Sequence, residues 1–132
     1  DFNAGKIPLT EFVDRKKDND ILVNIIVKKQ PLRVCYMSQR NTKTDFPVLT
    51  CAAAKTEAGY RFSIGARPGK AVLFELADAD IQAADVENMA ENAAKCVKEQ
   101  VETGSNTRGS AEYRKHLAGV LVRRAVCKLA GK

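Results

Sequence analysis

Residues 109–125 read GSAEYRKHLAGVLVRRA, and this stretch predicts the last helix of the chain. Ser110 is a residue type that caps helix N-termini, while Glu112 and Lys128 carry the charges that suit the two ends of the helix dipole. The middle, residues 117–122, is apolar most of the way round. Because such a helix has to be buried on more than one side, we expect it to lie between a sheet and a neighbouring helix.

That neighbouring helix is predicted immediately upstream. From Val86 to Val101 the apolar residues recur at three- to four-residue spacing, which is typical of an amphipathic helix, and Gly104 ends it. Residues 104–109 are polar and read as the loop between the two helices.

Strand patterns fill most of the chain before residue 86. The clearest is the alternation of apolar and polar residues from Tyr60 to Arg67, which follows the turn residues Glu57-Ala58-Gly59. Residues 48–55 fit a strand or a helix, and residues 1–20 read as an extended lead-in. Further strands are predicted at Ile21 to Lys28, at about Arg33 to Arg40, and at Ala71 to Leu76.

The order of these elements predicts the fold class. Strands come first and two long helices follow, which indicates an α+β domain of two layers. We expect an antiparallel sheet of three to five strands, with the two packed C-terminal helices on one side. The length of 132 residues suits a single domain, residues 1–132.

Composition sets limits on the class of protein. With 45% hydrophobic and 29% charged residues, and no apolar run long enough to span a bilayer, the chain is expected to be a soluble domain without a membrane partner. The net charge of +6 could indicate an anionic partner, although its cations are scattered and soon met by acids. The chain does not begin with Met, so we expect it to be part of a longer polypeptide, although removal of a leader or a tag would look the same.

No grouping of residues predicts a catalytic or metal site. The four cysteines are far apart and suit buried reduced thiols, which favours the cytoplasm. The single histidine, His116, sits in a basic helical run and is expected to face solvent or an ion-pair partner. Residues 65–69, Gly-Ala-Arg-Pro-Gly, could bind phosphate, but they follow no phosphate-loop pattern, and a hairpin turn is the better interpretation.

The stretch at 109–125 closely resembles the last helix of the FAD-binding subunits of molybdenum hydroxylases, the family of xanthine dehydrogenase and carbon monoxide dehydrogenase. That family typically has small residues, a Tyr-Arg pair, His-Leu and an apolar run ending in paired arginines, as here. Weaker resemblance covers nearly all the rest of the chain, at Asp1-Phe2 with Leu9, at residues 20–25, at residues 36–49 with Arg40, Asp45 and Phe46, and at residues 64–68.

The resemblance implies a C-terminal domain that closes over FAD held mainly by two preceding domains outside this sequence. In the family the entry to this domain passes near the isoalloxazine ring, so Ile21 and Leu22 are candidates for apolar flavin contact, or else ordinary strand core residues. The family often has a basic residue after the aromatic equivalent to Tyr36, where this chain has Met37 or Ser38. Met37 is therefore a further candidate, and the departure puts NAD as the electron acceptor in doubt.

The partners implied are subunits or domains that bind molybdopterin and 2Fe–2S clusters, from which electrons would reach FAD. The chain would then be part of an oxidoreductase and not a complete enzyme. Two alternatives stay open. One is a small basic RNA-binding module, which the charge supports and the 6% of aromatic residues opposes. The other is a pure assembly domain without flavin contact.

Overall fold

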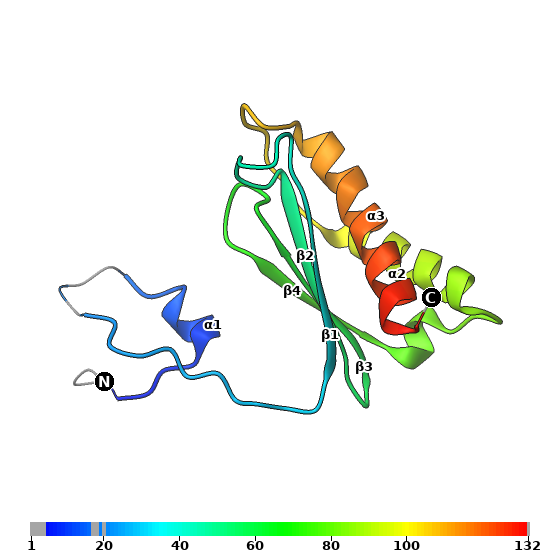
Figure 1. Cartoon of the computed structure of the whole chain (residues 1–132), viewed down its shortest axis with the longest axis horizontal. Coiled ribbons are helices and arrows are strands. Elements are labelled where there is room, and N and C mark those ends of the chain that lie inside the picture. The colour runs from blue at the N-terminus through cyan, green and yellow to red at the C-terminus, as the bar shows by residue number, and fades with distance from the viewer. Residues whose placement is uncertain (1–4, 17–18, 20, 132) are drawn as a thin grey trace. The chain divides into compact units, whose positions relative to one another are not determined.

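The computed structural model of the chain describes residues 5–16, 19 and 21–131 (Figure 1). The chain divides into two compact units, Asp1–Pro31 and Leu32–Lys132. In the first unit the described residues form one short helix, α1 (Leu9–Phe12), within the segment predicted as an extended lead-in.

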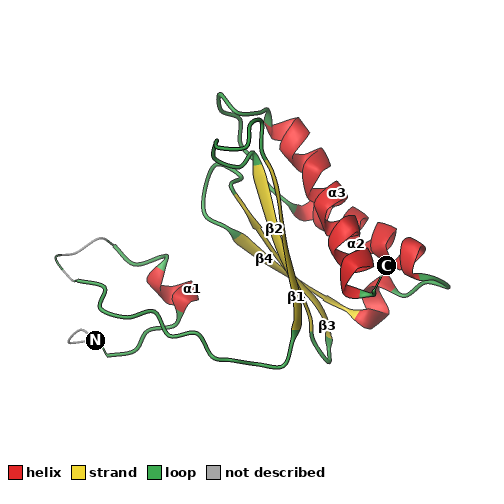
Figure 2. Cartoon of the chain, viewed as in Figure 1, coloured by secondary structure: helices red, strands yellow, loops and turns green. Residues whose placement is uncertain are grey.

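The second unit begins with an antiparallel sheet of four strands that follow one another in sequence order (Figure 2). Each strand pairs with the strand that follows it in the sequence, so every connection between paired strands is short. The segment 48–55, which fits either a strand or a helix by sequence, forms a strand. The bounds are β1 (Arg33–Gln39), β2 (Leu49–Lys55), β3 (Gly59–Gly65) and β4 (Val72–Ala77).

Two helices follow and cover one face of the sheet, after a short 3-10 turn, η1 (Asp78–Ile81) (Figures 1 and 2). They are α2 (Val86–Gln100) and α3 (Ala111–Leu129), and α3 packs on β1, β2 and α2. The Ser110 hydroxyl caps α3 by accepting a hydrogen bond from the backbone N–H of Tyr113. The predicted α+β architecture is confirmed, with four strands and two packed C-terminal helices.

The core lies between the sheet and the two helices. Alternate residues of the strands point into it, among them Cys51, Phe62 and Ile64, all fully buried. From the helices the core receives small and branched residues, which let α2 and α3 approach each other and the sheet: Ala90, Ala93 and Val97 of α2, and Ala118, Val122 and Ala125 of α3.

The strand predicted from Ile21 to Lys28 is wrong, because no described residue before Arg33 forms a strand. The segment is rich in β-branched residues, but a strand also needs a neighbour to accept and donate its ladder hydrogen bonds. Its apolar side chains are exposed by between 51% and 82% in this chain: Ile21, Leu22, Val23, Ile25, Ile26 and Val27.

Candidate functional site

The sheet has one face that the helices leave uncovered. Cys35 points toward the helices, with its thiol 3.9 Å from the carbonyl oxygen of Ala125, so its neighbours Val34 and Tyr36 point to the other face. Both are largely exposed. An open hollow of about 420 Å³ lies on this face and is lined mainly by small and apolar residues of three strands, including Ala52, Ala54 and Ser63.

A second feature is a buried arginine at the end of the domain where three loops meet. We call the loops 40–48, 66–71 and 101–110 the loop end. Arg114 of α3 is only 1% exposed, and its guanidinium donates to four oxygens of these loops. The acceptors are the carbonyl oxygens of Val48 (2.9 Å), Gly104 (2.6 Å) and Gly109, and Oδ1 of Asn106 (2.5 Å). One side chain therefore ties the strand connection to the helix connection.

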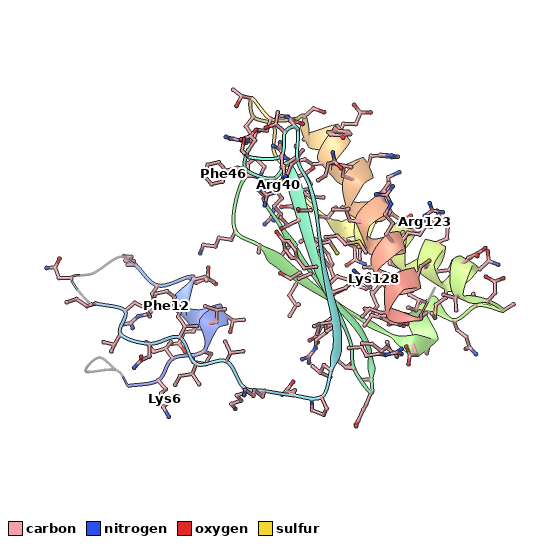
Figure 3. All side chains as sticks on the ribbon, viewed as in Figure 1. Lys6, Phe12, Arg40, Phe46, Arg123 and Lys128 are labelled. Atoms are coloured by element: carbon pink, nitrogen blue, oxygen red, sulfur yellow. The ribbon has the colours of Figure 1, made fainter. Side chains whose placement is uncertain are left out.

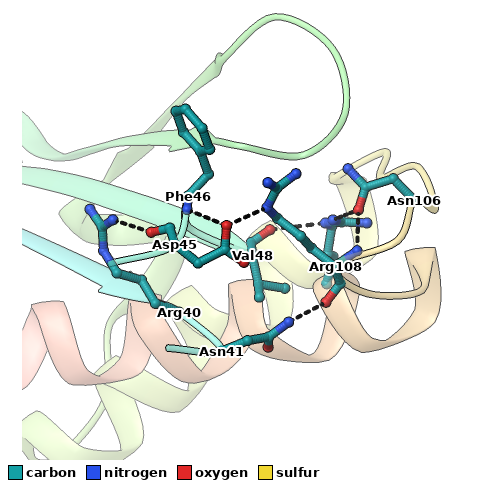
Figure 4. A network of polar contacts seen from close by, with 8 residues as sticks. Arg40, Asn41, Asp45, Phe46, Val48, Asn106 and Arg108 are labelled. Carbon is teal, nitrogen blue, oxygen red and sulfur yellow. Dashed lines mark hydrogen bonds and ion pairs between the residues drawn. The ribbon is translucent and has the colours of Figure 1, made fainter. Parts of the chain in front are cut away.

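Around this arginine a polar network continues to the surface (Figure 4). Arg108 Nε lies 3.0 Å from Oδ1 of Asp45, and the same oxygen accepts the backbone N–H of Phe46 at 2.7 Å. Arg40 donates to the carbonyl oxygen of Asp45 at 2.5 Å, and Asn41 donates to that of Arg108 at 3.1 Å. The β1–β2 loop is thus held to the α2–α3 loop at several points.

The surroundings in this network shift the pKa values of Asp45 and Arg114. The hydrogen bond from Arg108, followed by the backbone N–H of Phe46, holds the pKa of Asp45 below its usual value. Burial, followed by the positive charge of Arg108, lowers the pKa of Arg114. No carboxylate is among the four acceptors of the Arg114 guanidinium, so the network keeps an excess of positive charge.

We expect the substitution Asp45→Asn to destabilise the chain in a pH-dependent way. Because the folded-state pKa of Asp45 lies below the unfolded value of about 3.9, its charged form stabilises the fold above that pH, and this contribution is lost as pH falls through the folded pKa. The difference in urea midpoint between wild type and variant should therefore be largest near neutrality and shrink below about pH 4. A difference that stays constant down to pH 2 would contradict this role.

Two of the four cysteines are unsuited to nucleophilic chemistry. Burial, with a smaller contribution from Cys35, raises the pKa of Cys51 to about 12, and burial also raises the pKa of Cys35. Both thiols stay protonated at neutral pH. Within the described residues no three His, Cys, Asp or Glu side chains come together as metal ligands would, and no helix is long and apolar enough to cross a membrane.

The predicted site residues fall in different places. Ile21 and Leu22 lie in the first unit, 76% and 51% exposed, and Met37 lies in β1 of the second unit, partly buried and packed against the core. Ile21 and Leu22 therefore belong to one unit and Met37 to the other, and the three stay predicted flavin contacts. Asp1, Phe2 and Asp20, part of the segments that carried the weaker resemblance, lie outside the described residues.

The structure also places the predicted histidine and the predicted hairpin turn. His116 is exposed on α3, as expected. In the predicted hairpin turn, the Arg67 guanidinium donates to the carbonyl oxygens of Lys70 and Glu102, at 2.7 Å each, so it joins β3–β4 to the α2–α3 loop. The sheet is covered by helices on one side, as expected, but the place of Tyr36 on the open face was not predicted, although strand alternation was a signal that could have revealed it.

Solved structures with a similar fold include a quinoline oxidoreductase and two carbon monoxide dehydrogenases. Quinoline 2-oxidoreductase from Pseudomonas putida 86 matches with a TM-score of 0.66 at 23% identity over 76% of this chain and 38% of that chain. Carbon monoxide dehydrogenase from Hydrogenophaga pseudoflava, in a form lacking the Mo-pyranopterin moiety of the molybdenum cofactor, matches with a TM-score of 0.62 at 22% identity over 75% and 37%.

A third match is the cyanide-inactivated form of the Cu,Mo-CO dehydrogenase, with a TM-score of 0.58 at 21% identity over 76% of this chain and 37% of that chain. This chain thus spans less than two-fifths of each solved chain. At these identities the likeness shows the fold. No curated protein matches the sequence.

The sequence family that matches is described as the CO dehydrogenase flavoprotein C-terminal domain. The match runs over residues 35–129, which include nearly all of the sheet and both long helices. It covers the open sheet face around Tyr36 and the loop end around Arg114 alike. On this evidence the chain belongs to the CO dehydrogenase flavoprotein C-terminal domain family.

Proposed function

We propose that this domain covers the FAD of a flavoprotein subunit in a molybdenum hydroxylase and contacts the partner subunits of that enzyme. The observation that carries the proposal is the family match over residues 35–129. Two of the matched structures are carbon monoxide dehydrogenases whose names include molybdenum. The partners proposed are subunits or domains that bind molybdopterin and 2Fe–2S clusters.

The residues present fit one part of FAD and not another. An isoalloxazine ring needs a flat, largely apolar surface, and the open sheet face offers one, with the small residues Ala52, Ala54 and Ser63 beside the exposed ring of Tyr36. A pyrophosphate needs backbone N–H groups at a glycine-rich turn before a helix, and the sequence has no such turn. This supports a domain that closes over the ring while preceding domains hold the rest of FAD.

In this proposal the chain's residues shape the flavin environment and carry out no chemistry themselves. When bound, FAD supplies the redox chemistry, and the protein supplies orientation and electrostatics. Tyr36 is proposed to lie against the ring. Ile21 and Leu22 are separate candidates for apolar contact with the flavin, because removal of their exposed apolar surface from water is favourable. Met37 is proposed to influence the flavin only through β1, because its side chain packs against the core and not on the open face.

The first test is to purify the full-length protein that carries this domain under native conditions and record its visible absorption spectrum. The cofactor is then released by denaturation and identified. We expect stoichiometric FAD. A folded protein without flavin that retains nucleic acid would replace the proposal with the RNA-binding module that the net charge of +6 allows.

The same full-length protein allows a test of contact with the flavin. Leu22→Asp should weaken FAD binding by roughly tenfold or more, because a carboxylate against an apolar ring loses its hydration. Leu9→Asp is the matched control, since Leu9 is also an exposed leucine of the first unit. FAD that is bound equally by both variants, with an unchanged spectrum, would favour a domain with an assembly role only.

A further inference from the structure

The loop end carries an exposed aromatic side chain with an arginine beside it. Phe46 is 73% exposed, more than any other aromatic residue among those described. The Arg108 guanidinium carbon lies 5.3 Å from the centre of its ring, within the range of a cation–π interaction. Figure 3 shows Phe46 and Arg40 together at this end of the second unit. Aromatic residues are enriched at protein interfaces, so a ring presented in this way is suited to contact with another protein.

Hydrogen bonds to the backbone of Phe46 and its neighbour, and not burial, hold Phe46 in place. Its backbone N–H donates to the Asp45 carboxylate at 2.7 Å, and that carboxylate is in turn 3.0 Å from Arg108 Nε. Arg40 fixes the carbonyl oxygen of Asp45 (Figure 4). A side chain presented on a backbone that is already ordered loses less conformational entropy when a partner binds.

The surroundings of Phe46 are also cationic. Arg40, Arg108 and Arg114 lie in the network with one carboxylate, that of Asp45, which leaves an excess of two positive charges. Within the described part of the chain, the Arg40 side chain uses one donor and the Arg108 side chain uses only Nε. The remaining guanidinium donors of both residues make no hydrogen bond with the part of the chain that the structure describes, so they can donate to carboxylates of another molecule.

We propose that Phe46, Arg40 and Arg108 form a docking surface for a protein that presents an apolar socket bordered by carboxylates. Arginine and aromatic residues are the side chains that dominate binding energy at the centre of protein interfaces. A second copy of this chain does not fit, because each copy carries a net charge of +6. A nucleic acid fits less well, because one aromatic ring with Arg108 beside it is not a row of stacking platforms.

The partner is taken to be another subunit of the assembly, and to that extent the inference rests on the function proposed above. The test uses the full-length flavoprotein subunit and the remaining subunits of its enzyme, purified separately and recombined. The dissociation constant is measured by analytical ultracentrifugation for the wild type, Phe46→Ala and Arg40→Glu. We expect each variant to bind at least about tenfold more weakly.

Matched controls separate this surface from general effects of mutation. Phe12→Ala removes an exposed phenylalanine of the first unit, and Arg123→Glu reverses an exposed arginine of α3 (Figure 3). Both should change the dissociation constant by less than about twofold, as expected of residues outside an interface hot spot. Assembly that is equally strong in Phe46→Ala and in the controls would overturn the proposal.

FAD content and melting temperature are recorded for each preparation. Phe46→Ala with lower FAD content or melting temperature and unchanged assembly would also overturn the proposal, because Phe46 would then pack inside its own subunit. If the variants weaken binding to the other subunits as expected but the protein contains no FAD, the flavin function is rejected and the docking surface is retained. Variants that lose bound nucleic acid, and not bound subunits, would show that the surface serves a different class of partner.

Discussion

Replacement of Arg114 by methionine is expected to lower the free energy of unfolding of the chain by about 3–5 kcal/mol. Methionine retains much of the length and packing of the side chain but none of its donors. The carbonyl oxygens of Val48, Gly104 and Gly109 would lose the guanidinium that now donates to them. Leaving a buried acceptor unpaired costs about 1–3 kcal/mol, and here several are affected at once.

The matched control is Arg123→Met, the same substitution at an exposed position of the same helix. It should change the free energy of unfolding by no more than about 0.5 kcal/mol, as is usual for surface positions. Arg114→Lys should fall between the two, because an ammonium group keeps the charge but cannot reach all four acceptors of the planar guanidinium. Urea unfolding measures all three. A loss for Arg114→Met no larger than that for Arg123→Met would mean that the loops hold together without this residue.

Most of the fold could be predicted because its elements follow local patterns. The alternation from Tyr60 to Arg67 corresponds to β3, and the Ser110 cap marks the start of α3 where it was expected. Each neighbouring pair of strands is antiparallel and joined by a short connection, so sequence neighbours are also neighbours in space. Local patterns are therefore sufficient for this sheet.

The segment from Ile21 to Lys28 shows where such patterns fail. Its β-branched residues favour an extended backbone, but whether a segment forms a strand depends on a partner for its N–H and C=O groups. The sheet of the second unit consists of β1 to β4 alone among the described residues, and the segment lies in the first unit. Propensity describes the segment itself, whereas pairing is a property of the tertiary structure.

The candidate site was predictable only in part. Strand alternation assigns Tyr36 and Met37 to opposite faces of β1, but only the position of α3 decides which face is open. The Arg114 network joins residues 66 positions apart, as in the hydrogen bond to Val48. Nothing in the spacing of single residues indicates that this arginine is buried, because arginine is a typical surface residue. The resemblance at residues 109–125 included Arg114 but not its partners.

The substitution Gly59→Ala is expected to destabilise the chain by about 3 kcal/mol or more. Gly59 begins β3 with a φ of +148°, a backbone conformation that side-chain-bearing residues rarely adopt and that costs them about 1–3 kcal/mol. Space is the larger obstacle. A Cβ atom at this position would lie 2.1 Å from the carbonyl oxygen of Leu76 and 2.8 Å from the Cα of Ala77, so β4 would have to move away from β3.

Gly69→Ala separates these two causes. Gly69 has a similar φ of +131°, but a Cβ atom there would meet nothing within 4 Å. This control should therefore lose only the conformational part, about 1–3 kcal/mol. Urea unfolding of both variants gives the cost of the close contact between β3 and β4 as the difference between their losses. Equal losses would show that β4 yields to the added methyl group, and that backbone conformation alone makes glycine necessary at the start of β3.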